Sequence, residues 1–193
     1  MCNCYEYDLA EWEIRELVAH YTLIGRNWRS PVEVLPNQYG EVVVDRGGER
    51  TLDDMRWEPG FERWKSLVEN KAQRCVVPAT RFALSGRSAG LPAWQWFVRP
   101  NHKPFMFAGV WTTWHGERGT REAPAASEHR VYSIVSTEAN ALVQPFDDTM
   151  PVILTTAAEV EQWLTGTVQQ ALALHKSAAN DALRLLPEEK KAA

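Results

Sequence analysis

Short strand-like segments follow one another so closely in this 193-residue chain that they restrict the fold more than any other feature. They are rich in β-branched and aromatic residues and are separated by turn signals such as Pro36-Asn37 and Gly47-Gly48. Strands are expected at 32–35, 41–45, 51–57, 75–78, 94–98, 105–114, 131–136 and 151–154. With helices at the ends of the chain, this spacing predicts an α+β fold around a mostly antiparallel, curved sheet.

The helix signals lie mainly near the two ends of the chain. The stretch from Asp8 to Glu11 resembles a capping box, and it predicts a helix with Leu9, Trp12, Leu17 and Tyr21 near one face. Further helices are expected at 61–70, at 137–143 after Thr137, from Thr155 or Thr156 to Leu164, and at 167–179. A chain of this length suits a single domain.

Charge and composition argue against several classes of protein. The net charge of −4 disfavours a general polyanion binder, although residues 21–137 carry sixteen basic and twelve acidic side chains. A modest nucleic-acid-binding patch and scattered surface arginines both fit that local bias. No apolar run approaches the roughly 20 residues of a membrane span, so no membrane partner is expected. The acidic start of the chain is also unlike a secretory signal.

The cysteines and histidines indicate free thiols and no metal site. Three cysteines, an odd number, point to a reducing compartment, so we expect a cytoplasmic protein. Cys2 and Cys4 are too close for an easy disulfide, and neither they nor the five histidines have metal-ligand spacing. We therefore expect no metal and no cofactor, and the sequence does not define an oligomeric state.

Cys2 is the first residue that could carry chemistry. Methionine aminopeptidases generally remove Met1 when a small residue follows it, and removal here would leave a thiol and an α-amine on adjacent carbons. Such a 1,2-aminothiol condenses with an aldehyde to give a five-membered thiazolidine. The thiolate could instead attack an acyl group, as in N-terminal nucleophile hydrolases. The remaining alternative is that Cys2 has no chemical role.

Aromatic and acidic residues leave two further alternatives open. Seven of the nine tryptophans lie in the more basic middle of the chain, where they could stack on single-stranded bases or pack in the core. Trp94 and Trp96 alternate with Gln95, which favours a shared strand face and the core. Asp147-Asp148 is typical of a turn beside proline, and a paired-carboxylate site would require one raised pKa.

Several stretches, taken in order, resemble one known family. They are Met1-Cys2, Val34-Leu35-Pro36, Gly47-Gly48-Glu49-Arg50 with Met55-Arg56-Trp57, Arg74-Cys75-Val76-Val77-Pro78-Ala79, Phe107-Ala108-Gly109-Val110-Trp111, Ser136-Thr137-Glu138-Ala139-Asn140, and Met150-Pro151-Val152-Ile153-Leu154 with Trp163-Leu164. Together they resemble the SRAP, or SOS-response-associated peptidase, family over about residues 1–186. This implies one SRAP-like domain at 1–186 and a polar C-terminal tail at 187–193.

The resemblance implies a fold, an activity and a partner. SRAP proteins bind single-stranded DNA and recognise abasic sites in the DNA-damage response. Cys2, freed by autocatalytic peptidase processing, would form a thiazolidine with the ring-opened sugar and so crosslink the protein to DNA. The implied fold is a single α+β domain with a curved, barrel-like, mostly antiparallel sheet, flanking helices and a positive DNA groove.

The chain also departs from the family pattern at its active-site positions. Leu84 stands where the family has a glutamate, Asp147 where it has a histidine, and Thr149 where an arginine follows. The family's Asn-Ala-Arg-x-Glu stretch is missing between Trp57 and Cys75, unless Asp54 to Glu58 takes its place in a second register. Leucine cannot move a proton, so the general acid–base help that is commonly worth about 10²–10⁴-fold is reduced.

These comparisons give a set of expected site residues and three hypotheses. Cys2 is the expected nucleophile and imine-forming amine, Asp147 a substitute proton carrier and Glu138 a second one. Arg56, Trp57, Arg74 and Ser136 are expected to line the DNA groove, and Cys75 is expected to be buried. The protein is then a covalent crosslinker, a noncovalent single-stranded-DNA-binding module, or a degenerate paralogue with a protein partner.

Overall fold

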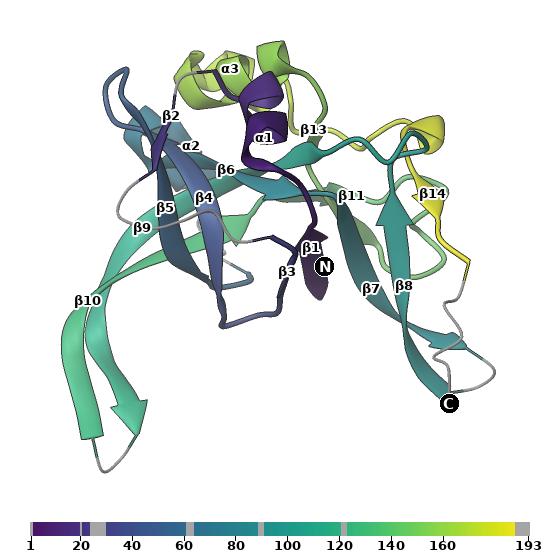
Figure 1. Ribbon diagram of the computed structural model, residues 1–193, viewed down its shortest axis with the longest axis horizontal. Coiled ribbons are helices and arrows are strands. Elements are labelled where there is room, and N and C mark those ends of the chain that lie inside the picture. The colour runs from purple at the N-terminus through teal and green to yellow at the C-terminus, as the bar shows by residue number, and fades with distance from the viewer. Residues whose placement is uncertain are drawn as a thin grey trace.

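Five strands close into a barrel at the centre of the fold (Figure 1). They are β4 (Tyr39–Asp45), β5 (Arg50–Trp57), β6 (Arg74–Ala79), β9 (Phe105–Thr120) and β10 (Ala123–Ile134). The pairing runs β10-β5-β4-β6-β9 and returns from β9 to β10, antiparallel at every step except β5–β10. The computed structural model describes residues 2–19, 21–23, 30–60, 64–88, 91–120 and 123–187. The expected α+β fold with a curved, barrel-like and mostly antiparallel sheet is confirmed.

Alternation of side chains explains why these strands enclose a core. Gly40 lies opposite Met55, and Val42 lies opposite Asp53, in the β4–β5 register. Because side chains two residues apart share a face of a strand, Met55 and Trp57 point to the same side as Asp53. Met55 and Trp57 are fully buried in the hydrophobic core, so this is the inner face of the barrel.

A second sheet packs beside the barrel and contains the start of the chain. Its order is β14 (Arg184–Leu185), β8 (Leu91–Val98), β7 (Arg81–Ser88), β1 (Cys4–Tyr7) and β3 (Val32–Val34), all antiparallel. Strand β1 is therefore an interior strand, bonded to β3 on one side and to β7 on the other. Neither β1 nor β7 is among the strands expected from the sequence.

Smaller strands complete the barrel wall. Strand β2 (Tyr21–Leu23) pairs in parallel with β5, and β13 (Ile153–Leu154) pairs with β9. Strands β11 (Ser136–Glu138) and β12 (Thr149–Pro151) form a separate two-stranded ribbon. The helix expected at 137–143 is wrong, because Thr137 belongs to β11 and the residues after it form turns.

The helices cover one end of the barrel (Figure 1). They are α1 (Glu11–Leu17), α2 (Trp64–Glu69), α3 (Ala157–Thr165) and α4 (Val168–Leu172), with 3-10 turns at Lys71–Gln73 and Asn180–Ala182. Helix α3 is confirmed, with Thr156 as its N-cap accepting from the backbone N–H of Glu159. Helix α4 ends well short of the expected residue 179.

The first helix differs from its prediction in two respects. Ala10 and not Asp8 is the N-cap residue, and the Glu13 carboxylate accepts from the backbone N–H of Ala10 at 2.7 Å. Leu9 and Leu17 are buried as expected, but Trp12 is 62% exposed and Ile14 takes the buried position. Ile14 lies three residues before Leu17 and therefore shares its face of the helix, whereas Trp12 lies five residues before it and does not.

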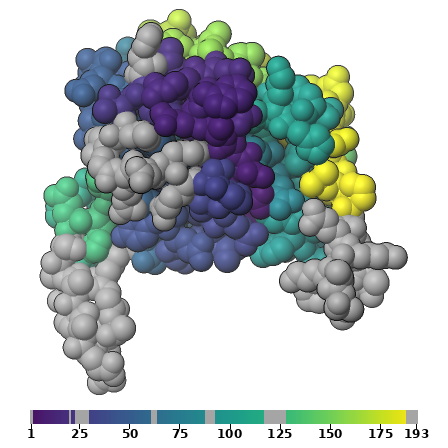
Figure 2. Space-filling view, in the orientation of Figure 1, coloured from purple at the N-terminus to yellow at the C-terminus, as the bar shows by residue number. Residues whose placement is uncertain are grey.

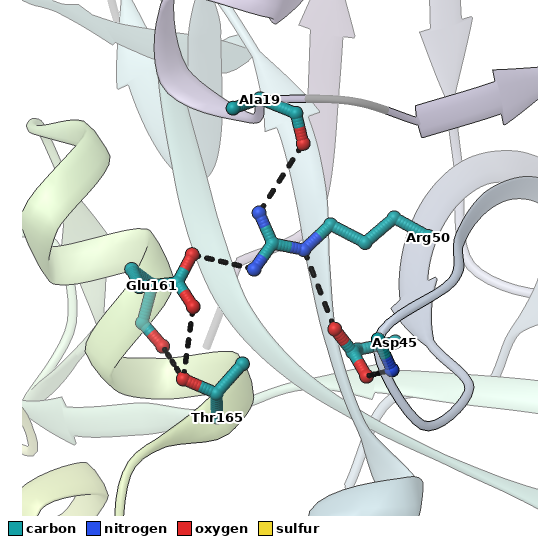
Figure 3. A network of polar contacts seen from close by, with 6 residues as sticks. Ala19, Asp45, Arg50, Glu161 and Thr165 are labelled. Atoms are coloured by element: carbon teal, nitrogen blue, oxygen red, sulfur yellow. Dashed lines mark hydrogen bonds and ion pairs between the residues drawn. The ribbon is translucent and has the colours of Figure 1, made fainter.

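One arginine ties the helical end to the barrel (Figure 3). Arg50, at the start of β5, donates to the backbone oxygen of Ala19 after α1 and to the Asp45 carboxylate at the end of β4. The same guanidinium pairs with Glu161 on α3, whose other oxygen accepts from Thr165. Three segments far apart in the sequence are thus held at one point.

Within the described ranges, no helix is long and apolar enough to cross a membrane. Those ranges also hold no group of three or more His, Cys, Asp or Glu side chains arranged to bind a metal ion.

Candidate functional site

Strand β1 places the start of the chain between β3 and β7. The backbone N–H of Asn3 donates to Ala83 of β7 at 3.0 Å, and the Asn3 side chain accepts from the backbone N–H of Ser85 at 3.0 Å. In Figure 2 this N-terminal segment, in purple, crosses the face of the body between the β3–β5 part and the β7–β8 part. Cys2 is therefore held next to an interior strand.

Cys2 itself is buried and protonated in this form of the protein. Its side chain is 3% exposed, and the thiol donates to the backbone oxygen of Cys4 at 3.2 Å. Burial raises the pKa of the Cys2 thiol far above its ordinary value. Cys4 and Cys75 are likewise buried free thiols, and the burial expected for Cys75 is confirmed. Because thiolates are the reactive form, Cys2 is unreactive until its surroundings change.

Asp147 meets the start of the chain. Burial alone would raise the pKa of this carboxyl, but hydrogen bonds from the chain's α-amino group and from Thr149 outweigh it and lower the pKa. Thr149 donates both its backbone N–H and its hydroxyl to Oδ1 of Asp147, each at 2.8 Å. Asp147 follows Cys2 by more than 140 residues in the sequence, and the fold holds its carboxylate through Thr149 of the β11–β12 ribbon.

Two buried tyrosines lie near Cys2, and sequence reasoning missed both. The hydroxyls of Tyr5 and Tyr132 are 2.5 Å apart and share a hydrogen bond. Burial raises the pKa of each phenol, with a smaller contribution from the neighbouring Cys2 thiol. A Cβ at Gly40 would collide with both hydroxyls, so this glycine makes room for the pair. No motif or spacing in the sequence points to this contact.

Leu84 lies in the hydrophobic core and is fully buried. It stands on β7 between Ala83 and Ser85, the two residues that bond to Asn3. An apolar side chain therefore occupies the strand position beside the start of the chain. Proton transfer there must come from another group.

The residues expected to line a groove are scattered by the fold. Trp57 is 1% exposed and packs edge-on against Tyr5, with ring centroids 5.3 Å apart. Arg74 is completely buried and donates to the backbone oxygens of Val68, Trp163 and Gly166. Neither side chain reaches the surface in this structure.

The other expected residues lie nearer to solvent. Arg56 is partly exposed, pairs with Glu58 at 3.1 Å and donates to the side chain of Asn37. Glu138 is exposed on β11, and Ser136 on the same strand is partly buried. Both belong to the β11–β12 ribbon, which also contributes Thr149 to the hydrogen bonds on Asp147. The β11–β12 ribbon thus contacts the Asp147 side chain through Thr149.

A pocket of about 260 Å³ opens beside Ser85. Its described lining is Ser85, Gly86, Ala93 and Trp94, and Trp94 is 43% exposed. Ser85 also bonds to Asn3, the residue that follows Cys2, so one lining residue of the pocket contacts the start of the chain. An exposed indole beside a small cavity is a surface on which a nucleobase could stack.

Comparisons with known proteins agree with this architecture. Residues 61–191 match the model of the family described as SOS response associated peptidase (SRAP). A solved protein structure from Bordetella bronchiseptica has a TM-score of 0.73 at 16% identity, covering 97% of this chain and 100% of that one. One from Bacteroides thetaiotaomicron has a TM-score of 0.70 at 15% identity, covering 95% and 90%. A phage-related protein of B. bronchiseptica has a TM-score of 0.64 at 18% identity, covering 98% and 95%. No curated protein matches the chain in sequence.

Proposed function

Because this chain belongs to the SOS response associated peptidase (SRAP) family, we propose that it crosslinks to abasic sites in single-stranded DNA through Cys2. Family membership makes it an SOS-response-associated protein, and the crosslinking activity is our proposal. The observation that carries the proposal is the anchoring of the start of the chain, where Asn3 bonds to Ala83 and Ser85 of β7 beside the buried Cys2. The Asp147 carboxylate, held by Thr149, is the group proposed to serve the α-amine that Cys2 gains when Met1 is removed.

The proposed reaction begins when Met1 is removed, by an aminopeptidase or by the peptidase activity that the family name describes. The new α-amine of Cys2 adds to the aldehyde of the ring-opened sugar, and loss of one water gives an imine. The Cys2 sulfur then adds to the imine carbon, and the thiol proton ends on the nitrogen. A thiazolidine results, with no oxidant or reductant needed.

Removal of Met1 also changes the reactivity of the buried thiol. The amine would then stand on the Cys2 Cα itself, where its positive charge stabilises the thiolate at close range. The thiol would titrate nearer to neutral pH than it does in the longer chain, in which burial dominates. We therefore expect the form that retains Met1 to form no thiazolidine, since its α-amine and the Cys2 thiol are not on adjacent carbons.

Asp147 is proposed to position the amine and to carry protons for it. As an anion it holds the ammonium near the incoming aldehyde, and it can accept the proton that the amine must lose before it attacks. Thr149 holds this carboxylate in place through two hydrogen bonds to Oδ1. Leu84 offers no second proton donor, so the ring-opening step is expected to be slow. Glu138 remains a second proposed proton carrier, on the exposed ribbon.

The test is a crosslinking assay with single-stranded DNA that carries one abasic site. Protein whose mass shows loss of Met1 should give a covalent species on a denaturing gel, and Cys2→Ala should abolish it. Asp147→Asn should slow formation by about tenfold or more, because it removes the proton acceptor. Asp148→Asn, at the exposed neighbouring carboxylate, is the matched control and should react at the normal rate.

A second candidate function is noncovalent binding of single-stranded DNA. The burial of Cys2 and the leucine at position 84 favour it over crosslinking. If processed protein gives no Cys2-dependent crosslink but binds undamaged oligonucleotides with a steep salt dependence, this second function replaces the first. If it does neither, the chain is a degenerate paralogue.

A further inference from the structure

A cluster of two arginines, one aspartate and one tryptophan lies where the barrel wall changes strands. Strand β5 pairs with β2 up to Leu52 and with β10 from Arg56 onwards. In the part of the chain that the structure describes, residues 53–55 have no strand partner on that edge. Asp53 lies in this gap, on the inner face of β5, and its side chain is 1% exposed.

Asp53 is neutralised by arginines from two different elements. Arg46, in the β4–β5 turn, donates to Oδ2 of Asp53 at 2.6 Å, and Arg130 of β10 pairs with the same oxygen. Burial of a carboxylate requires such pairing, so Asp53 fixes the position of both guanidiniums. Two positive charges share one negative charge, which leaves the Asp53 cluster with a net charge of +1.

Both guanidiniums keep donors free for a ligand. Their side chains are 41% and 42% exposed, so each has one edge on Asp53 and another towards solvent. Each arginine carries five N–H donors. Arg46 uses one on Asp53 and one on Thr51, and Arg130 uses one on Asp53. Two planar forks held side by side match the oxygens of a phosphate group, which prefers such bidentate contacts.

Trp111 adds a flat apolar surface to the same cluster. The Arg46 guanidinium lies over its ring at 5.5 Å from the centroid. The indole N–H of Trp111 and Oδ1 of Asp53 are both buried and have no hydrogen-bond partner among the described residues. Trp111 lies opposite Tyr132, and Arg130 is two residues before Tyr132 on the same face of β10. The cluster is thus about 7 Å along one strand from the tyrosine pair near Cys2.

We infer that Arg46 and Arg130, held by Asp53, form a phosphate-binding site at this gap in the barrel. The ligand is a phosphate group carried either by the backbone of single-stranded DNA or by a free nucleotide. The DNA backbone as source rests on the proposed function, whereas the phosphate chemistry does not. The site needs neither Cys2 nor a lesion in the DNA.

The experiment measures binding of undamaged DNA to protein that cannot crosslink. Fluorescence anisotropy of a labelled thymidine oligomer is recorded at low salt with Cys2→Ala protein, alone and combined with Arg46→Gln or Arg130→Gln. Each glutamine should weaken binding by about tenfold and lower the slope of log affinity against log salt by about one. Arg15→Gln, which removes an exposed arginine paired with Glu11 on α1, is the matched control and should change neither.

Arg46→Gln leaves Asp53 paired with Arg130, so this variant tests the phosphate site even if Arg130→Gln does not fold. Titration with thymidine monophosphate separates the two sources: saturable binding that either variant removes assigns a free nucleotide phosphate, and oligomer binding alone assigns the DNA backbone. Oligomer affinities of the two variants equal to that of the Arg15→Gln control, with no binding of the monophosphate, would overturn the site. Because Cys2 is absent throughout, this outcome is independent of whether crosslinking occurs.

Discussion

Arg74 and the Asp53 cluster show two opposite uses of arginine in one barrel. Arg74 is completely buried, and its Nε and Nη1 donate to three backbone oxygens of α2, α3 and the residue after α3, whereas Nη2 has no partner among the described residues. Arg46 and Arg130 are held by a buried carboxylate but keep about two-fifths of their side chains in solvent. A buried arginine that donates to backbone oxygens holds helices and strands together. An arginine that a carboxylate holds in place and that is still partly exposed can bind a ligand.

Among the variants that test the difference between Arg74 and the Asp53 cluster, Arg74→Met should have the largest effect on the free energy of unfolding. Methionine fills part of the volume but leaves three buried carbonyl groups without a donor, so unfolding should become easier by about 3 kcal/mol or more. Urea denaturation followed by tryptophan fluorescence measures this difference. Arg46→Met is the matched change in the other region, and there the loss should be about 1 kcal/mol or less because the arginine is half in water. Equal losses at the two positions would contradict the distinction.

A smaller effect is expected from Asp53→Asn. The side chain keeps its shape but no longer neutralises the two arginines, which can turn into solvent because both are partly exposed already. We expect a loss of about 1 kcal/mol in the free energy of unfolding, measured by the same denaturation. A loss as large as that of Arg74→Met would mean that the cluster is part of the architecture and not a binding site.

The smallest effect concerns pH and the network of Figure 3. The Arg50 guanidinium lowers the pKa of Glu161, so the pair stabilises the fold above the unfolded pKa of the carboxyl, about 4.3. That contribution is lost as the pH falls through the lower, folded pKa. Because Glu161 is about half exposed, the contribution should be below about 1 kcal/mol.

Comparison of wild type with Glu161→Gln isolates this contribution. The difference in their unfolding free energies should be measurable at pH 7 and should vanish near pH 2. Glu69→Gln, at an exposed residue of α2, serves as the control and should show no such trend. A Glu161 difference that persists unchanged at low pH would exclude the ion pair as its cause.

Much of the barrel could be predicted from the sequence because its strands carry the signal themselves. The valines of β4, the alternation in β5 and the apolar run of β9 all indicated strands. Strand β7 was missed because Arg81-Phe82-Ala83-Leu84-Ser85-Gly86 has a glycine and two small residues where strands prefer large ones. Strand β1 was missed because its four residues, Cys4–Tyr7, are too few to show a clear pattern next to the helix signal at Asp8.

The site was harder to predict than the fold. Asp147 was chosen through a resemblance, since nothing in its local pattern shows that it meets the α-amino group. Arg74 was expected to line a DNA groove through the same resemblance, and only the meeting of α2, α3 and β6 supplies the backbone oxygens that its buried guanidinium bonds. The ion pairs of the Asp53 cluster join the β4–β5 turn, β5 and β10, and no sequence pattern in one of these elements predicts its contact with the others.

The interior position of β1 has a consequence for the order of events on the ribosome. Cys4 pairs with Ala83, so β1 cannot bond to β7 until about 80 residues have been made, although its pairing with β3 needs only residues 32–34. At about 5–20 residues per second, the β7 side of β1 stays unpaired for roughly 4–16 s. An aminopeptidase acting during synthesis therefore meets an extended, accessible end, whereas one that arrives later meets a strand already locked between two neighbours.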